Sequence, residues 1–198
     1  ARITSHNGAM LIFDETVTGF RWSLGGAQEY FGVTPDLATF GKGMANGMPL
    51  SAVVGRRDIM REFEDVFVSS TFGGECLSLA AAIATIEEMR EKQTINRVWD
   101  LGQHLARTLN KVGVQSFGYG CRLFLKPESD SSERRSLLLQ ELVKRGILFH
   151  SGLFFNLCYS HNEKDIAETI MAFEGSLQAI KEGVKLEGTV IQPAFRRV

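Results

Sequence analysis

Short apolar runs joined by glycine-rich connections dominate the first part of the chain, and this pattern constrains the fold more than any other feature. Runs at 8–13, 36–40, 51–54 and 66–69 show little alternation of apolar and polar residues. Uninterrupted apolar strands are typical of parallel sheets that are covered on both faces. The sequence therefore predicts an α/β unit built on a mostly parallel sheet.

The remaining sequence mixes helical and strand patterns, which predicts a smaller α+β unit. Apolar residues in 95–112 recur at three- and four-residue spacing, as they do on a helix with one packed face. We expect the boundary after residue 92, so that the two parts span 1–92 and 93–198. Three further helices are expected: one begins at 77, one ends at Gly146, and one opens at a capping box in 160–163. Strands are expected at 121–125 and 154–157.

Charge and hydropathy argue against several classes of protein. The net charge is −1, and no basic cluster suggests a nucleic-acid partner. No apolar run approaches the ~20 residues of a membrane-spanning helix. Three isolated cysteines, at 76, 121 and 158, form neither a zinc spacing nor a disulfide framework, which favours a reducing cytoplasm. Because the sequence lacks an initiator Met and its first strand comes very early, we expect that the true beginning is missing.

One lysine and one acid suggest a chemistry. Lys42 lies between two glycines after an apolar run, and Asp14 ends an earlier apolar run. Pyridoxal 5′-phosphate (PLP) chemistry needs a lysine amine that forms a Schiff base with the cofactor aldehyde, and an acid that keeps the ring nitrogen protonated. Each residue alone has an ordinary explanation, as a solvated surface lysine and as an acid that caps a helix or turn. The pair makes PLP chemistry the leading hypothesis.

Four segments around this pair resemble the signatures of class III aminotransferases, and most of all the branch that includes glutamate-1-semialdehyde aminomutase. They are LIFDETVTGFR at 11–21, GGAQEYFGVTPDL at 25–37, FGKGMANGMPL at 40–50 and GRRDIM at 55–60. The segments match in order and at family-like spacing. The resemblance is close over residues 8 to about 90 and loose over the remainder. It implies a fold-type I PLP-dependent transferase.

The resemblance also implies roles for individual residues. Lys42 would carry the Schiff base and then shuttle a proton between the substrate carbon and the cofactor. Asp14 would pair with the ring nitrogen, and Thr16 would lie against the ring. Thr71 would reach the cofactor phosphate across the interface of a homodimer. Arg122 falls where some family members have an arginine for a substrate carboxylate; the alternative is a surface or strand-edge arginine.

Several positions depart from the family pattern. Thr16 replaces the usual Val, and Val17 replaces a Gln or Met that hydrogen-bonds the phenolic oxygen of the cofactor. Residues 74–76 are Gly-Glu-Cys, where the family usually has Gly-Asn-Pro. These changes leave the basic chemistry intact but leave the identity of the substrate open. Cys76 is either a reactive thiol or a small buried residue at a helix start, and we expect the second. Trp22 either lines a substrate channel or packs a loop.

The N-terminal half of the family carries another phosphate loop and an aromatic residue that stacks on the cofactor, and neither is found in this sequence. The family chain is also about twice as long. The resemblance therefore implies a C-terminal half, in which 1–92 is the last portion of the PLP-binding large domain and 93–198 is the small domain. The expected function is amino-group transfer, as a transaminase or an aminomutase, between a small-molecule amino donor and a carbonyl acceptor.

Two other classes of function stay open. The first is a truncated, non-catalytic remnant that binds PLP weakly or acts as an interaction module. Retention of Lys42 and Asp14 argues against decay of the site, whereas truncation argues for loss of activity. The second is a lysine-based enzyme without PLP, such as a Schiff-base aldolase. The loop around Thr71 and the acid at position 14 argue against this class, because such an enzyme needs neither.

Overall fold

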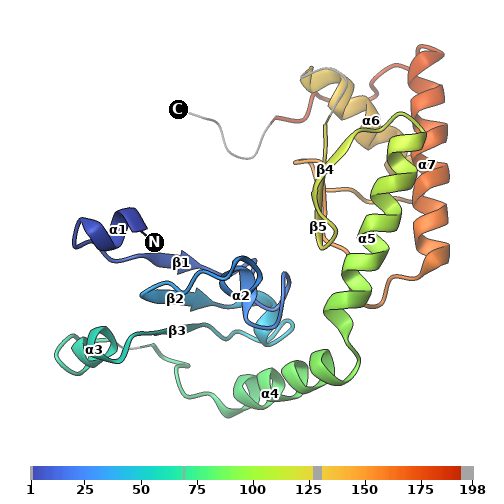
Figure 1. The fold of residues 1–198 in the computed structure, drawn as a ribbon. Coiled ribbons are helices and arrows are strands. Elements are labelled where there is room, and N and C mark those ends of the chain that lie inside the picture. Colours follow the sequence, from blue (N-terminus) through green and yellow to red (C-terminus); the bar gives the residue numbers. More distant parts are fainter. Residues whose placement is uncertain (1, 69, 127–130, 193–198) are drawn as a thin grey trace. The chain divides into compact units, whose positions relative to one another are not determined.

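The computed structural model describes residues 2–68, 70–126 and 131–192, and the chain falls into two compact units, 1–95 and 96–198 (Figure 1). The first unit contains α1 (Arg2–His6), β1 (Ile12–Asp14), α2 (Gly26–Phe31), β2 (Leu37–Phe40), the 3₁₀ helix η1 (Lys42–Met44), β3 (Ala52–Gly55), α3 (Arg57–Met60), the 3₁₀ helix η2 (Arg61–Glu64) and α4 (Cys76–Glu91). The second contains α5 (Thr94–Lys111), β4 (Ser116–Tyr119), β5 (Arg122–Leu125), α6 (Ser132–Lys144), β6 (Phe154–Phe155) and α7 (Glu163–Lys181).

The first unit is built on a three-stranded mixed sheet with the order β1-β2-β3. Strands β1 and β2 are parallel, as expected, with Ile12 opposite Leu37. Strand β3 runs antiparallel to β2, because the chain between them forms a 3₁₀ turn and returns directly, whereas a parallel strand needs a longer crossover. The fourth expected strand does not form over residues 66–68, whose side chains are exposed, and residue 69 lies outside the described residues.

A small apolar cluster joins η1 to α4 in the first unit. Met44, Ala45 and Ala82 are its buried members, and Phe40 from the end of β2 packs against them. Helix α4 confirms the helix that was expected from residue 77. Its first free N–H groups are capped by Glu75, whose carboxylate accepts from the backbone of residues 77 and 78. The cluster therefore fixes the turn that carries Lys42 against a long helix.

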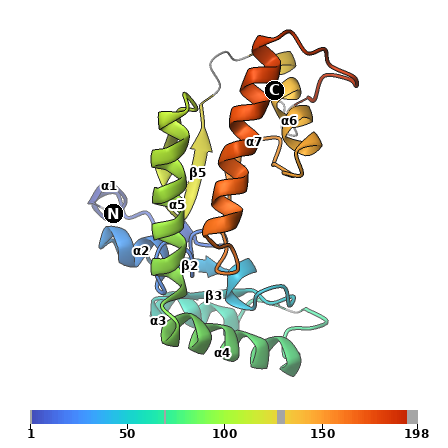
Figure 2. The same ribbon diagram turned by 90° about the vertical axis from the view of Figure 1, so that its right-hand side faces the viewer.

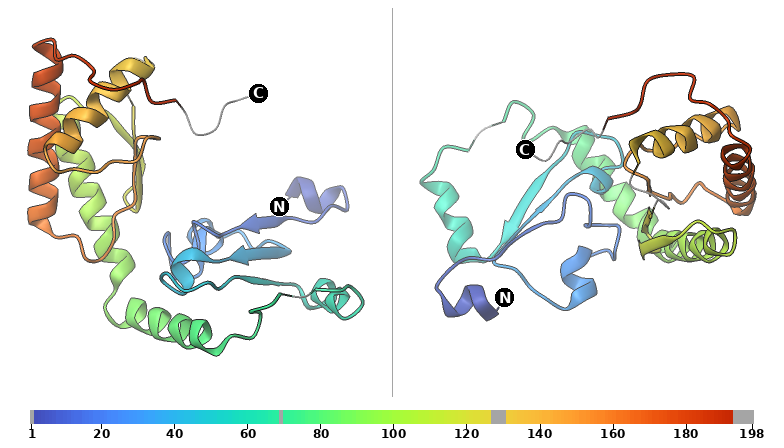
Figure 3. Two further views of the ribbon diagram at one scale, coloured as in Figure 1. Left: turned by 180° about the vertical axis from the view of Figure 1, so that it is seen from behind. Right: turned by 90° about the horizontal axis from the view of Figure 1, so that it is seen from above.

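The second unit is an antiparallel sheet, β4-β5-β6, with its three helices on one side (Figure 3). Helices α5 and α7 run beside one another along the unit (Figure 2) and are joined by an ion pair of 3.3 Å between Arg97 and Glu163. The predicted packed face of α5 is confirmed, because Leu101, Leu105 and Leu109 are at most 1% exposed. Strand β4 was not expected from the sequence. Among the described residues of both units, no helix is long and apolar enough to cross a membrane.

The capping box of α7 lies two residues later than expected. Asn162 is the N-cap, and its side chain accepts from the backbone N–H of Lys164 at 2.8 Å. Asp165 completes the box by accepting from the Asn162 N–H at 2.8 Å. The expected box over 160–163 was wrong, because Glu163 is the first helical residue and its carboxylate pairs with α5 instead.

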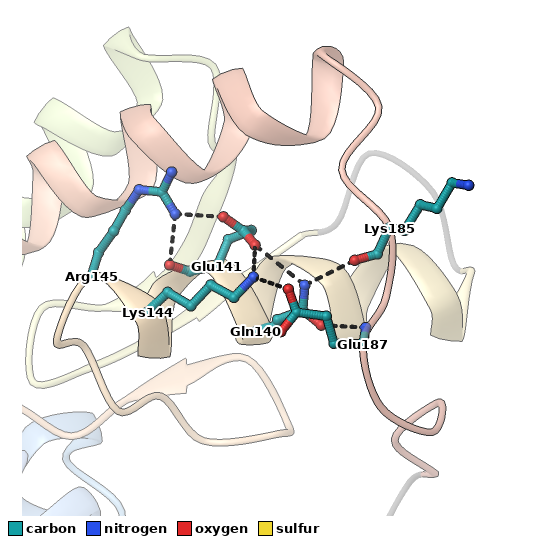
Figure 4. Close-up of polar contacts among 6 residues, drawn as sticks. All are labelled: Gln140, Glu141, Lys144, Arg145, Lys185 and Glu187. Atoms are coloured by element: carbon teal, nitrogen blue, oxygen red, sulfur yellow. Dashed lines mark hydrogen bonds and ion pairs between the residues drawn. The ribbon is translucent and has the colours of Figure 1, made fainter.

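A buried carboxylate ties α6 together near its end (Figure 4). Glu141 is 4% exposed; its carboxylate is 2.7 Å from Arg145 and 3.2 Å from Lys144. Hydrogen bonds from Arg145, and then from Gln140 and Lys144, lower the pKa of Glu141 from 4.5 to about 2. Lys144 also bonds Glu187 at 2.5 Å, so the same cluster holds the chain that follows α7.

We expect Glu141 to make the stability of the second unit depend on pH. Its folded-state pKa lies below its unfolded value, so the contribution is complete above pH ~4.5 and is lost as the pH falls towards ~2. Glu141→Gln should lower the free energy of unfolding by about 1–3 kcal/mol at pH 7, and the loss should shrink below pH ~4. Urea unfolding between pH 3 and pH 7 measures this. Glu168→Gln, at a half-exposed side chain of α7, is the control, and an equal loss there would contradict the assignment.

Candidate active site

Asp14 ends β1 and is held by two donors. Its Oδ1 accepts a hydrogen bond from the Thr16 N–H at 2.9 Å and from the Thr39 hydroxyl at 3.2 Å. These bonds, those to Thr16 first, lower the pKa of Asp14, and the positive charge of Lys42 adds to the shift. Thr39 lies opposite Asp14 in the parallel register of β2. The pairing of β1 with β2 therefore presents an ionised, exposed carboxylate at the strand ends.

Lys42 follows β2 and begins η1 at the same edge of the sheet. Its side chain is exposed, and its backbone has a φ of +45°, in the left-handed region that non-glycine residues rarely adopt. Such strain persists only where the surroundings impose it, and it concentrates at functional sites. Here the buried Met44 and Ala45 impose it, because they pack the rest of the turn against α4. The lysine thus has a fixed backbone and a side chain open to solvent.

Thr16 contacts both Asp14 and the residue that precedes Lys42. Besides the N–H bond to Asp14, its Cγ2 lies 3.5 Å from the position that a Cβ on Gly41 would occupy. Gly41 immediately precedes Lys42. The structure thus brings together three of the four residues that the sequence suggested, Asp14, Thr16 and Lys42. Their proximity follows from the parallel pairing of two strands whose carboxyl ends share one edge.

Thr71 is not joined to the other three. It is exposed in a turn in which the Gly73 N–H donates to the Ser70 carbonyl at 3.2 Å. Within the part of the chain that the structure describes, no hydrogen bond or ion pair links Thr71 to Asp14, Thr16 or Lys42. Its assignment to a phosphate stays a prediction.

Glu15 is a residue of the site that sequence reasoning missed. It follows Asp14 but is 1% exposed. Its carboxylate accepts from the N–H groups of Ala27 at 2.9 Å and Gln28 at 2.8 Å, and from the Thr18 hydroxyl. The available signal was the consecutive pair of acids at a strand end. Because neighbouring strand residues face opposite sides, only one of the two can lie on the exposed side.

The remaining candidates have mixed outcomes. Trp22 is buried in the first unit, which favours loop packing over a role in a channel. Cys76 begins α4 as expected, but the expectation that it is buried was wrong, because the turn before α4 leaves it exposed. Arg122 is half-buried on β5, and its guanidinium lies over the rings of Phe124 at 5.4 Å and Phe154 at 5.1 Å.

Asp14, Thr16 and Lys42 could together bind a compound that contains both a carbonyl group and a basic ring nitrogen. An exposed primary amine can condense with an aldehyde, and a neighbouring ionised carboxylate can hold a protonated ring nitrogen. The residues present therefore fit the cofactor that the sequence suggested.

Comparison with known proteins gives a consistent result. The family model described as "Aminotransferase class-III" matches residues 1–168. A glutamate-1-semialdehyde 2,1-aminomutase of Alkaliphilus oremlandii is 37% identical over 91% of this chain and 47% of its own length. A 3-aminobutyryl-CoA aminotransferase of Cloacimonas acidaminovorans is 37% identical over 87% of this chain and 44% of its own length.

The solved structure of the PLP internal aldimine form of the FumI protein from a Sphingopyxis species is also similar. It is 26% identical, with a TM-score of 0.82, over 91% of this chain and 45% of that one. The chain therefore spans about half the length of each of these three proteins.

Proposed function

The chain belongs to the class-III aminotransferase family, and on that premise we propose that it carries the lysine and the acid of a PLP-dependent amino-group transfer site. The observation that supports this most is the convergence of an exposed Lys42 and an ionised Asp14 at the ends of paired strands. Because the chain covers about half of its relatives, the reaction of the whole enzyme is part of the proposal. The first unit would be the last portion of the cofactor-binding domain, and the second the small domain.

Each residue at the strand ends has a distinct task in this proposal. When bound, PLP supplies an electron sink for the amino-bearing carbon of the substrate. The Lys42 amine would hold the cofactor covalently and would serve as the base that moves a proton at the substrate carbon. Asp14 keeps the ring nitrogen protonated, and the donors on Thr16 and Thr39 hold its carboxylate ionised. The Thr16 methyl group, which lies beside Gly41, would present an apolar surface to the ring.

The substrate assignment rests on the relatives. Their names include both an aminomutase, which moves an amino group within one molecule, and an aminotransferase, which passes it between two. We propose an amino-group donor and a carbonyl acceptor without choosing between the two reactions. Arg122 is the proposed group for a substrate carboxylate, because its guanidinium lies over two aromatic rings and a guanidinium can bind a carboxylate through two parallel hydrogen bonds. Thr71 would bind the cofactor phosphate, contributed across the interface of a homodimer.

Covalent labelling tests the proposal directly. The chain is mixed with PLP, reduced with borohydride and digested, and the modified peptides are mapped by mass spectrometry. Condensation of the amine with the aldehyde releases water, and reduction makes the bond permanent. We expect the label on Lys42, with the exposed Lys92 of the same unit as the internal control. Labelling spread over Lys92 and other lysines to the same extent would contradict the proposal and favour a non-catalytic remnant.

A further inference from the structure

Asp14 and Glu15 are consecutive acids with opposite surroundings. Asp14 is exposed at the edge where Lys42 lies, whereas Glu15 is 1% exposed on the other side of the same strand end. An ionised carboxylate is costly to bury unless donors surround it. Glu15 is a buried carboxyl group, and it immediately follows Asp14, the acid that the proposed chemistry needs.

The partners of Glu15 belong to the loop that leaves β1. One carboxylate oxygen accepts from Ala27 N–H and from the Thr18 hydroxyl, and the other accepts from Gln28 N–H. Gly26 leaves room for this carboxylate, because it has a φ of +83° and a Cβ there would lie 2.6 Å from the Glu15 carboxylate. The Glu15 side chain therefore closes the loop between residues 15 and 28 through these hydrogen bonds.

The backbone of Glu15 is tied to the neighbouring strand as well. Its N–H donates to the Thr39 carbonyl at 2.9 Å, which extends the parallel pairing one residue past Asp14. The hydroxyl of the same threonine donates to Asp14 at 3.2 Å. Glu15 is thus held from both sides, by the loop through its carboxylate and by β2 through its N–H, and Asp14 takes its direction from this anchored backbone.

We propose that Glu15 is a positioning residue for Asp14: its buried carboxylate fixes the strand end so that the Asp14 carboxylate faces the ring nitrogen of the cofactor. This inference rests on the proposed function. In this inference Glu15 does not touch the cofactor or the substrate. Any effect of Glu15 on cofactor binding must therefore act through the contact between Asp14 and the ring nitrogen.

A cofactor analogue separates positioning from general stability. We would measure, by absorbance titration of the full chain, the affinity for PLP and for the analogue in which carbon replaces the ring nitrogen. The ratio of the two affinities reports the Asp14 contact alone. The wild type should prefer PLP about tenfold or more, as expected for a charge-assisted hydrogen bond. Glu15→Gln should lower this ratio several-fold, towards that of Asp14→Asn.

Two further variants sharpen the test. Thr18→Val removes one donor to the Glu15 carboxylate and should give a smaller fall in the ratio. Glu29→Gln is the matched control, because the Glu29 carboxylate accepts from Gly25 in the same loop but is exposed, and it should leave the ratio unchanged. A Glu15→Gln protein that binds both compounds more weakly at an unchanged ratio would overturn the inference alone. A wild type without any preference would overturn the role of Asp14, and the inference with it.

Discussion

Lys42→Ala should abolish the proposed amino-group transfer. In the proposed site the substitution removes the covalent anchor of the cofactor and the base that moves the proton, and loss of a positioned general base alone typically costs about 10²–10⁴-fold in rate. The fold should survive, because Lys42 is exposed and its side chain supports no packing. Alanine at this φ of +45° keeps the same strain and adds none of its own. The measurement is turnover with an amino donor, together with the absorbance of the bound cofactor.

The control for this prediction is Lys92→Ala. Lys92 is an exposed lysine of the same unit that follows α4 and pairs with Glu88. It should keep full turnover, because it lies on a helix end and not at the strand edge. Near-normal turnover of Lys42→Ala would show that the lysine is not the anchor, and the proposed function would then fail.

Gly102→Ala should destabilise the second unit, although the same change usually stabilises a helix. In an exposed helix, Gly to Ala gains about 1 kcal/mol. At this position a Cβ would lie 1.7 Å from the carbonyl oxygen of Gly120, at the turn between β4 and β5. Backbone cannot move aside as a side chain can, so we expect a loss of about 3 kcal/mol or more in the free energy of unfolding. Thermal and urea unfolding, followed by circular dichroism, measure it.

Gly175→Ala provides the comparison in α7. Its Cβ would meet the Arg145 side chain at 2.7 Å, and a side chain can shift. The loss there should be clearly smaller than at position 102. Equal losses at both positions, or a gain at position 102, would show that α5 does not cross the β4–β5 turn as closely as described.

The long helices of this protein could be predicted from the sequence better than the directions of its strands. The apolar repeat of α5 is local, so Leu101, Leu105 and Leu109 identified their helix directly. The direction of β3 could not be predicted in the same way, because a short apolar run is compatible with either pairing. Strand β4 was missed for a related reason: Gly118 weakens its apolar pattern, yet a Cβ there would lie 2.8 Å from the Arg122 carbonyl oxygen of β5. Gly120, just after the strand, is required where the chain meets α5.

The residue types of the candidate site could also be predicted from the sequence. Lys42 and Asp14 were suggested by their flanking motifs, and the structure places them at one sheet edge, while their roles stay predictions. The residue types could not distinguish the roles of Glu15 and Asp14, because both are acids. Its role depends on burial, which is decided by the loop that folds back over the strand.

By itself the sequence determined the family, the helical faces and the chemical groups available, because these depend on residue identity and on spacing along the chain. Only the tertiary structure decided which acid stays in water and which is buried, and how the lysine turn is braced against α4. Burial and hydrogen bonding involve residues far apart in the chain, such as Glu15 with Gln28 and Asp14 with Thr39, and no local pattern encodes those distances.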